Sequence, residues 1–135
     1  MTYAFLVMKE LIRYHTQQYH LVIDGREYNE NAFLVSFANS SQFGNNACIS
    51  PGSDISDGLI EVCILKKFPL IYSPVLATRL FIKNINRSAY IKIIPAREVM
   101  ISSSEQLNFH IDGDPFPTGN TARLTINPLS LKVIV

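Results

Sequence analysis

The chain has 135 residues, of which 47% are hydrophobic and 17% charged, and its 12 Lys and Arg nearly balance its 11 Asp and Glu. Such a length and composition are typical of one domain with one core, so we expect a single domain over residues 1–135. The small net charge argues against a nucleic-acid partner, and the apolar runs are far shorter than the roughly 20 residues that cross a bilayer. Without the basic opening of a signal peptide, the sequence favours a cytoplasmic protein.

The first half of the chain predicts one helix followed by strands. Apolar residues recur at helical spacing from Tyr3 to Tyr14, which predicts an amphipathic helix packed on the core. The turn pair Asp24-Gly25 between two apolar runs predicts a β-hairpin. Phe33–Ala38 is apolar at nearly every position, which is typical of a strand covered on both faces.

A second helix is predicted from Pro74 to Lys83, with Ser73 as its cap and Asn84 as its end. Regular short strands with only two helices favour a mainly β fold, an antiparallel β-sandwich or barrel. All six glycines are isolated, so this chain carries no Gly-rich phosphate loop. The remaining strands are expected at Leu59–Leu65, Ala89–Ile94, Glu98–Ser102, Leu107–Ile111, Thr121–Ile126 and Leu131–Val135.

Cys48 and Cys63 have no further thiol or His at metal-ligand spacing and lie in apolar surroundings, which predicts two buried free thiols. The segment Phe68–Pro74 is rich in aromatic and apolar residues. Core packing is the favoured interpretation of this segment, and a lipid-facing surface is the alternative.

The first acidic segment runs from Pro51 to Leu59 and enters a predicted strand. Asp54 and Asp57 are three residues apart across a tight turn, and Gly58 can adopt positive φ. Two carboxylates and the carbonyl of Leu59 could therefore hold one cation, with several waters completing a magnesium or calcium site. Taken alone, the segment is also explained by an ordinary turn with Asp54 as a local cap.

The second acidic segment follows the predicted strand Leu107–Ile111. Period-two alternation places Leu107, Phe109 and Ile111 on the core side, and Asn108, His110 and Asp112 on the other. Asp112 and Asp114 then form an acidic turn, where a carboxylate could accept a proton from a hydroxyl. A solvated hairpin loop explains the same residues when they are taken alone.

In order and spacing, six pieces of the chain resemble the C-terminal domain of the diacylglycerol kinase and sphingosine kinase family of lipid kinases, especially its bacterial soluble members. The pieces are the Tyr3–Tyr14 helix, the Leu21–Gly25 strand and turn, the Val35–Asn39 strand, the Ser50–Leu59 stretch, the Ile111–Gly113 turn and the closing Ile126–Val133. The resemblance implies a C-terminal β-sandwich in a two-domain kinase related to NAD kinases, whose nucleotide motif lies in an N-terminal domain absent from this chain.

The resemblance further implies that Asp54, Asp57 and Leu59 form a metal site that supports activity, and that the Asp112-Gly113-Asp114 turn supplies the catalytic base. Many relatives have a Gly pair at Asn45-Asn46 and end the acidic turn in Glu rather than in Asp114. Because Asp is shorter by one methylene, the choice between Asp112 and Asp114 as the base stays open.

The implied reaction moves the γ-phosphoryl group of ATP to a lipid hydroxyl such as that of diacylglycerol, with Mg²⁺ as cofactor. The expected partners are the lipid, an N-terminal kinase domain, a transient membrane surface and a second copy of the chain. We expect this chain to be inactive alone, as an excised domain or the product of a truncated gene. Two alternatives are a non-enzymatic, cation-dependent β-sandwich binding module and, more remotely, a glycosidase with two carboxylates.

Overall fold

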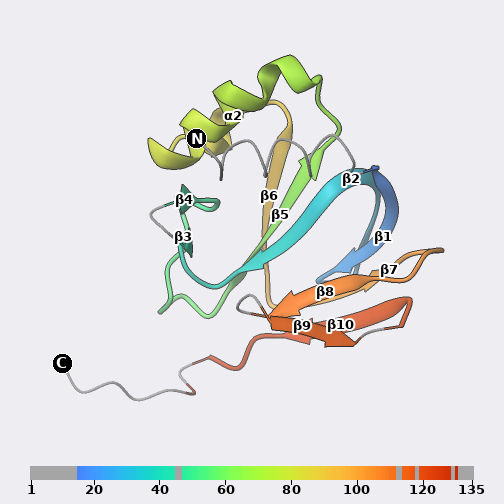
Figure 1. The fold of residues 1–135 in the computed structure, drawn as a ribbon. Helices are drawn as coiled ribbons and strands as arrows, with labels where there is room; N and C mark the ends of the chain where they lie inside the picture. The colour runs from blue at the N-terminus through green and yellow to red at the C-terminus, as the bar shows by residue number, and fades with distance from the viewer. Residues whose placement is uncertain (1–14, 45–46, 112–113, 118, 129, 131–135) are drawn as a thin grey trace.

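The structure is a computed structural model that describes residues 15–44, 47–111, 114–117, 119–128 and 130. Its main feature is a six-stranded antiparallel sheet in the order β10-β7-β1-β2-β5-β6, accompanied by the two-stranded pairs β3-β4 and β8-β9 (Figure 1). The strands are β1 Gln17–Ile23, β2 Arg26–Ala38, β3 Gln42–Gly44, β4 Ala47–Cys48, β5 Ile60–Lys66, β6 Ile91–Ala96, β7 Glu98–Ser102, β8 Asn108–Ile111, β9 Asp114–Pro117 and β10 Thr121–Thr125. The mainly β, antiparallel fold that the sequence predicts is confirmed.

The β1-β2 hairpin forms as its turn residues predict. Asp24 and Gly25 both have positive φ, at 46° and 82°, and Ile23 pairs with Arg26 across the two-residue turn. This geometry matches the right-handed twist of the two strands that it joins. The hairpin is therefore fixed by local chemistry.

β2 is one strand of 13 residues, which corrects the prediction of a separate strand at Phe33–Ala38. Its first part pairs with β1 and its second part with β5, and the register of the β5 pairing shifts between Ala32 and Leu34. Leu34 is 40% exposed, so the strand is not covered on both faces. The bulge changes which residues face the core, and period-two patterning cannot anticipate it.

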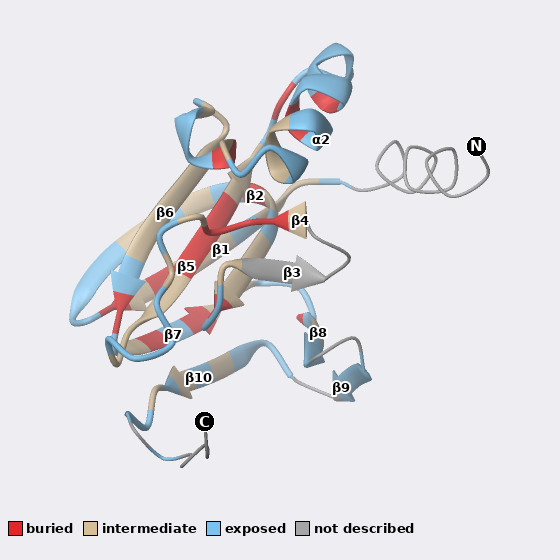
Figure 2. Cartoon of the chain, turned by 90° about the vertical axis from the view of Figure 1, so that its left-hand side faces the viewer, coloured by how far each residue is buried: buried red, intermediate tan, exposed pale blue. Residues whose placement is uncertain are grey.

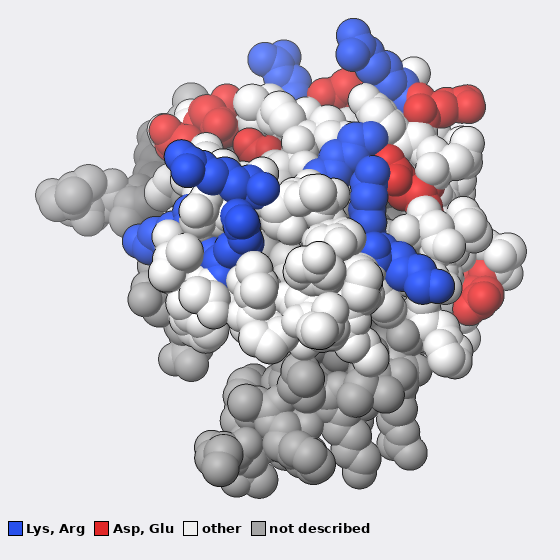
Figure 3. All heavy atoms as spheres, turned by 90° about the horizontal axis from the view of Figure 1, so that it is seen from above, with Lys and Arg blue, Asp and Glu red and all other residues white. Residues whose placement is uncertain are grey.

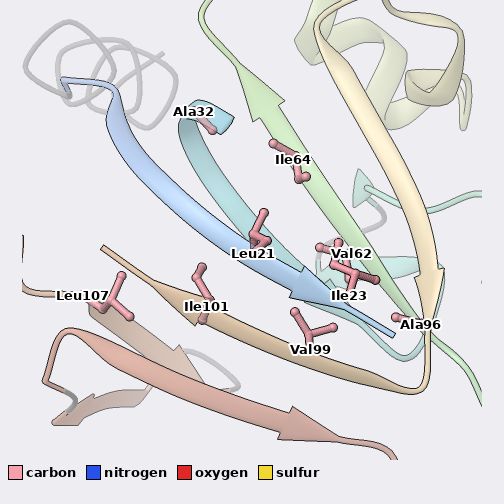
Figure 4. Close-up of a cluster of buried hydrophobic side chains, with 9 residues drawn as sticks. All are labelled: Leu21, Ile23, Ala32, Val62, Ile64, Ala96, Val99, Ile101 and Leu107. Atoms are coloured by element: carbon pink, nitrogen blue, oxygen red, sulfur yellow. The ribbon is translucent and has the colours of Figure 1, made fainter. Parts of the chain in front are cut away.

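The strand that is buried on both faces is β5. Val62 and Ile64 are fully buried in one apolar cluster, and Cys63 between them belongs to a second cluster on the opposite face. Figure 4 shows the first cluster, in which side chains from β1, β2, β5 and β7 converge. Its buried members are Leu21, Ile23, Ala32, Val62, Ile64, Ala96, Val99, Ile101 and Leu107.

Helix α2, Ser73–Phe81, lies between β5 and β6 in the chain, after a 3₁₀ turn at Leu70–Tyr72 and before another at Ile85–Arg87. In the burial view its outer surface is pale blue, whereas β5 and β7 each carry a red, buried stretch (Figure 2). Its inner side contributes Leu76 to a third apolar cluster with Phe68 and Ile85.

The termini of α2 correct the prediction in detail. Ser73 is the first helical residue rather than the cap, because the preceding 3₁₀ turn runs directly into the helix. Its hydroxyl donates instead to the Leu70 carbonyl at 2.6 Å. The helix ends at Phe81 rather than Lys83, since Lys83 has φ of 57° and the amide of Asn84 donates to the carbonyl of Arg79.

The two predicted elements at the ends of the chain, the Tyr3–Tyr14 helix and the Leu131–Val135 strand, lie outside the described residues. Cys48 and Cys63 are both buried and free, which confirms the prediction for the two thiols. Glu98–Ser102 forms a strand with the predicted bounds.

Candidate functional site

The first acidic segment forms a loop between β4 and β5, here called the acidic loop, residues 50–59. Two backbone hydrogen bonds shape it, from the Ser53 amide to the Ser50 carbonyl at 3.2 Å and from the Asp57 amide to the Asp54 carbonyl at 3.4 Å. Asp54 and Asp57 therefore lie in one short, exposed loop that is formed by successive turns.

The carboxylate of Asp54 is held by a single neighbour. Its Oδ1 accepts hydrogen bonds from the Ser56 hydroxyl at 2.6 Å and from the Ser56 amide at 2.8 Å. Both bonds favour the charged form, so they hold the pKa of Asp54 below its usual value, the hydroxyl having the larger effect. Asp54 therefore presents a fixed, ionised carboxylate to solvent.

Asp57 is oriented in a similar way by the residue that begins the next strand. Its Oδ1 accepts a hydrogen bond from the Leu59 amide at 2.8 Å. Gly58 between them has φ of 70°, a conformation in which a side chain is strained. Leu59 therefore contributes its amide to Asp57, and no described hydrogen bond involves its carbonyl.

Glu61, in β5, is close enough to Asp57 to be affected by its charge, and the sequence did not predict this. Burial, and secondarily the charge of Asp57, raise the pKa of Glu61. It pairs with Ala38 on β2 and Pro95 on β6, so its burial comes from neighbours distant in sequence. A lone acidic residue inside an apolar strand is the one signal that could have found it.

The donor set of the acidic loop fits a hard cation that keeps several waters. Asp54 and Asp57 each use one carboxylate oxygen for a local hydrogen bond, which leaves the other oxygen available. The repulsion between the charges of Asp57 and Glu61 also favours a cation here, because a divalent cation would reduce this repulsion. Within the described part of the chain no three His, Cys, Asp or Glu side chains gather closely enough to bind a metal by themselves. A cation here would therefore need backbone carbonyl and water ligands, as Mg²⁺ accepts.

The second acidic segment forms the β8-β9 hairpin. Asp114 is the exposed first residue of β9 and pairs with Ile111, while His110 on β8 pairs with Pro115. Asp112 lies outside the described residues. In the described part of the structure, no hydrogen bond or ion pair joins Asp114 to the acidic loop.

The predicted alternation along this strand is confirmed at its beginning and is wrong at its end. Leu107 is buried in the main core, and the Phe109 ring lies 6.1 Å from the ring of Phe37. Ile111, however, is 49% exposed. The hairpin pairs outside the six-stranded sheet, so its tip extends beyond the core that would cover Ile111.

The segment Phe68–Pro74 divides between two environments, so the prediction that it packs in the core is only partly correct. Phe68 is buried and its ring meets the ring of Phe33 edge to face at 5.3 Å. Leu70, Ile71 and Tyr72 form a 3₁₀ turn, and all three side chains are exposed.

Comparison with known proteins assigns the family. The model of the family described as the YegS C-terminal NAD kinase beta sandwich-like domain matches residues 1–135. The chain belongs to this family. A Shewanella frigidimarina protein named "Probable lipid kinase YegS-like" is 20% identical over 98% of this chain and 42% of its own length. A Yersinia enterocolitica protein of the same name is 26% identical over 80% of this chain and 35% of its own length.

Solved structures agree with the YegS C-terminal fold. The structure of a diacylglycerol kinase from Bacillus anthracis aligns over 92% of this chain and 47% of its own length, at 19% identity, with a TM-score of 0.62. A second structure from that organism covers 90% of this chain at 17% identity, with a TM-score of 0.69. The chain spans less than half the length of these relatives. Within the described residues, no helix has the length and apolar character needed to cross a membrane.

Proposed function

We propose that this chain is the C-terminal domain of an ATP-dependent lipid kinase that phosphorylates a lipid hydroxyl such as that of diacylglycerol. The observation that carries the proposal is the match of residues 1–135 to the YegS C-terminal NAD kinase beta sandwich-like domain. Relatives named as lipid kinases and as a diacylglycerol kinase support the class of reaction. An N-terminal domain would bind ATP, because this chain contains no Gly-rich phosphate loop.

In this proposal the acidic loop holds Mg²⁺. The free carboxylate oxygens of Asp54 and Asp57 and the carbonyl of Leu59 are the ligands, with water at the remaining positions. When bound, the ion neutralises negative charge near the phosphate site. The hydrogen bonds from Ser56 and from the Leu59 amide fix the two carboxylates before the ion arrives, which lowers the entropic cost of binding.

The hairpin supplies the base, either Asp112 or Asp114. A carboxylate there accepts the proton of the lipid hydroxyl while the hydroxyl oxygen forms its bond to the γ-phosphorus and the bond from that phosphorus to the bridging oxygen of ADP breaks. Asp114 is exposed at the start of β9, where a substrate can approach it. In the isolated domain neither carboxylate meets a nucleotide, so we expect no activity.

The test joins this chain to the nucleotide-binding half of its parent protein and measures ATP-dependent phosphorylation of a lipid panel. Replacing the true base with Asn should lower the rate by about 100-fold or more. Asp112→Asn and Asp114→Asn are compared with Glu105→Gln, an exposed carboxylate in the connection between β7 and β8. The base assignment fails if both Asn variants retain the full rate.

Two further measurements separate the alternatives. Asp57→Asn should weaken the dependence of the rate on magnesium, and an unchanged dependence would remove the metal role. Cation-dependent binding of a soluble ligand by this chain, together with an inactive two-domain protein, would instead favour the non-enzymatic binding module.

A further inference from the structure

The connection between β5 and β6, residues 67–90, here called the crossover segment, carries positive charge only. It contains Lys67, Arg79, Lys83 and Arg87 and no Asp or Glu. None of these four cations has an ion-pair partner among the described residues, whereas Lys66 and Lys92 just outside the segment both pair with Glu30. The segment therefore has an uncompensated positive charge.

The same segment also carries most of the exposed apolar surface. Of the eleven large apolar side chains that are exposed among the described residues, six belong to it. Ile71 is 82% exposed and Ile82 60%, which are high values for isoleucine. The six are Leu70, Ile71, Tyr72, Val75, Phe81 and Ile82.

The crossover segment is firmly attached to the sheet in spite of this exposure. Phe68, Leu76 and Ile85 are buried beneath it, and the ring of Tyr90 lies 6.1 Å from that of Phe68 and 5.6 Å from that of Tyr72. The exposed side chains thus stand on a packed layer. Rigid presentation lowers the entropy lost on binding a flat surface.

Charge and apolar surface lie on the same face. Val75 and Arg79 are four residues apart and so lie on the same side of α2, and the exposed Ile82 is the residue that caps the helix, whereas Leu76 is buried. Figure 3, seen from above, shows a white area near its centre bordered on both sides by Lys and Arg, with Asp and Glu beside these groups toward the upper left, the top and the right of the view.

We propose that the crossover segment docks this chain on an anionic lipid bilayer. Apolar side chains that insert at the headgroup level, together with flanking cations, match the two requirements of an interfacial membrane site. Cations that form no ion pair among the described residues distinguish this surface from an apolar patch meant for a neutral protein partner. The inference goes beyond the proposed kinase function, because it concerns binding without ATP and at residues outside both acidic segments.

The experiment measures co-sedimentation of the 135-residue chain with vesicles of phosphatidylcholine alone and of an equimolar mixture with phosphatidylglycerol. We expect binding to the anionic vesicles, and weaker binding when salt screens the charges. Absence of binding to anionic vesicles would overturn the proposal, as would equal binding to both compositions.

Paired variants locate the surface. The double variant Lys83→Gln/Arg87→Gln should lose binding roughly 25-fold, because each cation at an anionic surface contributes about fivefold. Its control is Arg26→Gln/Arg97→Gln, which changes the net charge equally in the β1-β2 and β6-β7 turns at the opposite end of β6.

Ile71→Ser should weaken binding about tenfold by removing inserted apolar surface, whereas Met100→Ser, at an exposed apolar position on β7, should not. Ile71 is so exposed that the substitution leaves folding intact. The proposal is overturned if the crossover variants bind as the unsubstituted chain does. If the unsubstituted chain binds no vesicles but forms a dimer that Ile71→Ser abolishes, the face belongs to a second copy of the chain and the proposal is overturned.

Discussion

Gly58 lies directly against Pro128: a Cβ atom at Gly58 would stand 3.3 Å from both the Cβ and the Cγ of the proline. The acidic loop and the segment after β10 are therefore packed together at this point. The contact joins a turn in the middle of the chain to a residue near its end, and a side chain at position 58 would press against the proline ring.

Gly58→Ala should destabilise the domain by about 1 to 2 kcal/mol from its left-handed backbone, with a further cost from the contact with Pro128. Two other glycines separate these causes. Gly25 has positive φ but open space around it, and Gly52 has open space and needs no positive φ. Chemical denaturation should rank the alanine variants as Gly58 the least stable, then Gly25, with Gly52 near the unsubstituted chain. Equal values for Gly58 and Gly25 would show that the proline contact is unimportant.

The side chain of Asp24 stabilises the fold by accepting hydrogen bonds from backbone amides of the β6-β7 corner. Its Oδ1 accepts hydrogen bonds from the amides of Arg97 and Glu98 at 3.0 and 2.9 Å, which ties the β1-β2 turn to the β6-β7 corner. Asp24→Ala should lower the free energy of unfolding by about 1 to 2 kcal/mol, whereas Asp24→Asn, which keeps an acceptor and tolerates positive φ, should lose less. Thermal denaturation of both variants checks this, and equal losses would contradict it.

Ser56→Ala should raise the pKa of Asp54 toward its ordinary value of 3.8, because it removes the hydroxyl that lowers this pKa most. A depressed folded-state pKa contributes stability that is present above pH 3.8 and is lost as the pH falls through the folded-state value. Titration of the Asp54 carboxyl carbon by NMR measures the shift. Ser104→Ala, in an exposed loop, is the control, and an unmoved Asp54 pKa in Ser56→Ala would disprove the assignment.

Cys63 should resist alkylation in the folded protein, because burial raises the pKa of its thiol to about 12. The neutral thiol is favoured by folding, so its contribution is present below pH 9.0 and is lost as the pH rises toward 12. Iodoacetamide labelling of a Cys48→Ala variant, with and without denaturant, isolates this thiol. Equal labelling rates in the two conditions would contradict the prediction.

The sequence predicted features whose causes are local. Asp24-Gly25 needs only two residues with positive φ to form its turn, and Cys48 and Cys63, in apolar runs of sequence, are buried and free as predicted. The acidic loop is similar, since Asp54 and Asp57 find their hydrogen-bond donors two residues away.

Features that depend on distant partners escaped prediction. The bulge in β2 depends on where β5 pairs, and the burial of Glu61 depends on β2 and β6. The exposure of Ile71 could not be predicted either, because its apolar neighbour Phe68 is buried and composition alone cannot separate the two. The roles of Asp112 and Asp114 stay predictions, because a catalytic base is defined by its contact with a substrate, which no local sequence pattern describes.

The pairing of β1 with β7 also determines when this domain can fold. The Ser102 hydroxyl donates to the carbonyl of His20, 82 positions earlier in the chain, and β7 separates β1 from β10 in the sheet. Contacts of such large sequence separation slow folding to the millisecond-to-second range that is common for β proteins. During synthesis on the ribosome, we therefore expect the edge of β1 that pairs with β7 to stay unpaired until Ser102 and its neighbours have left the exit tunnel.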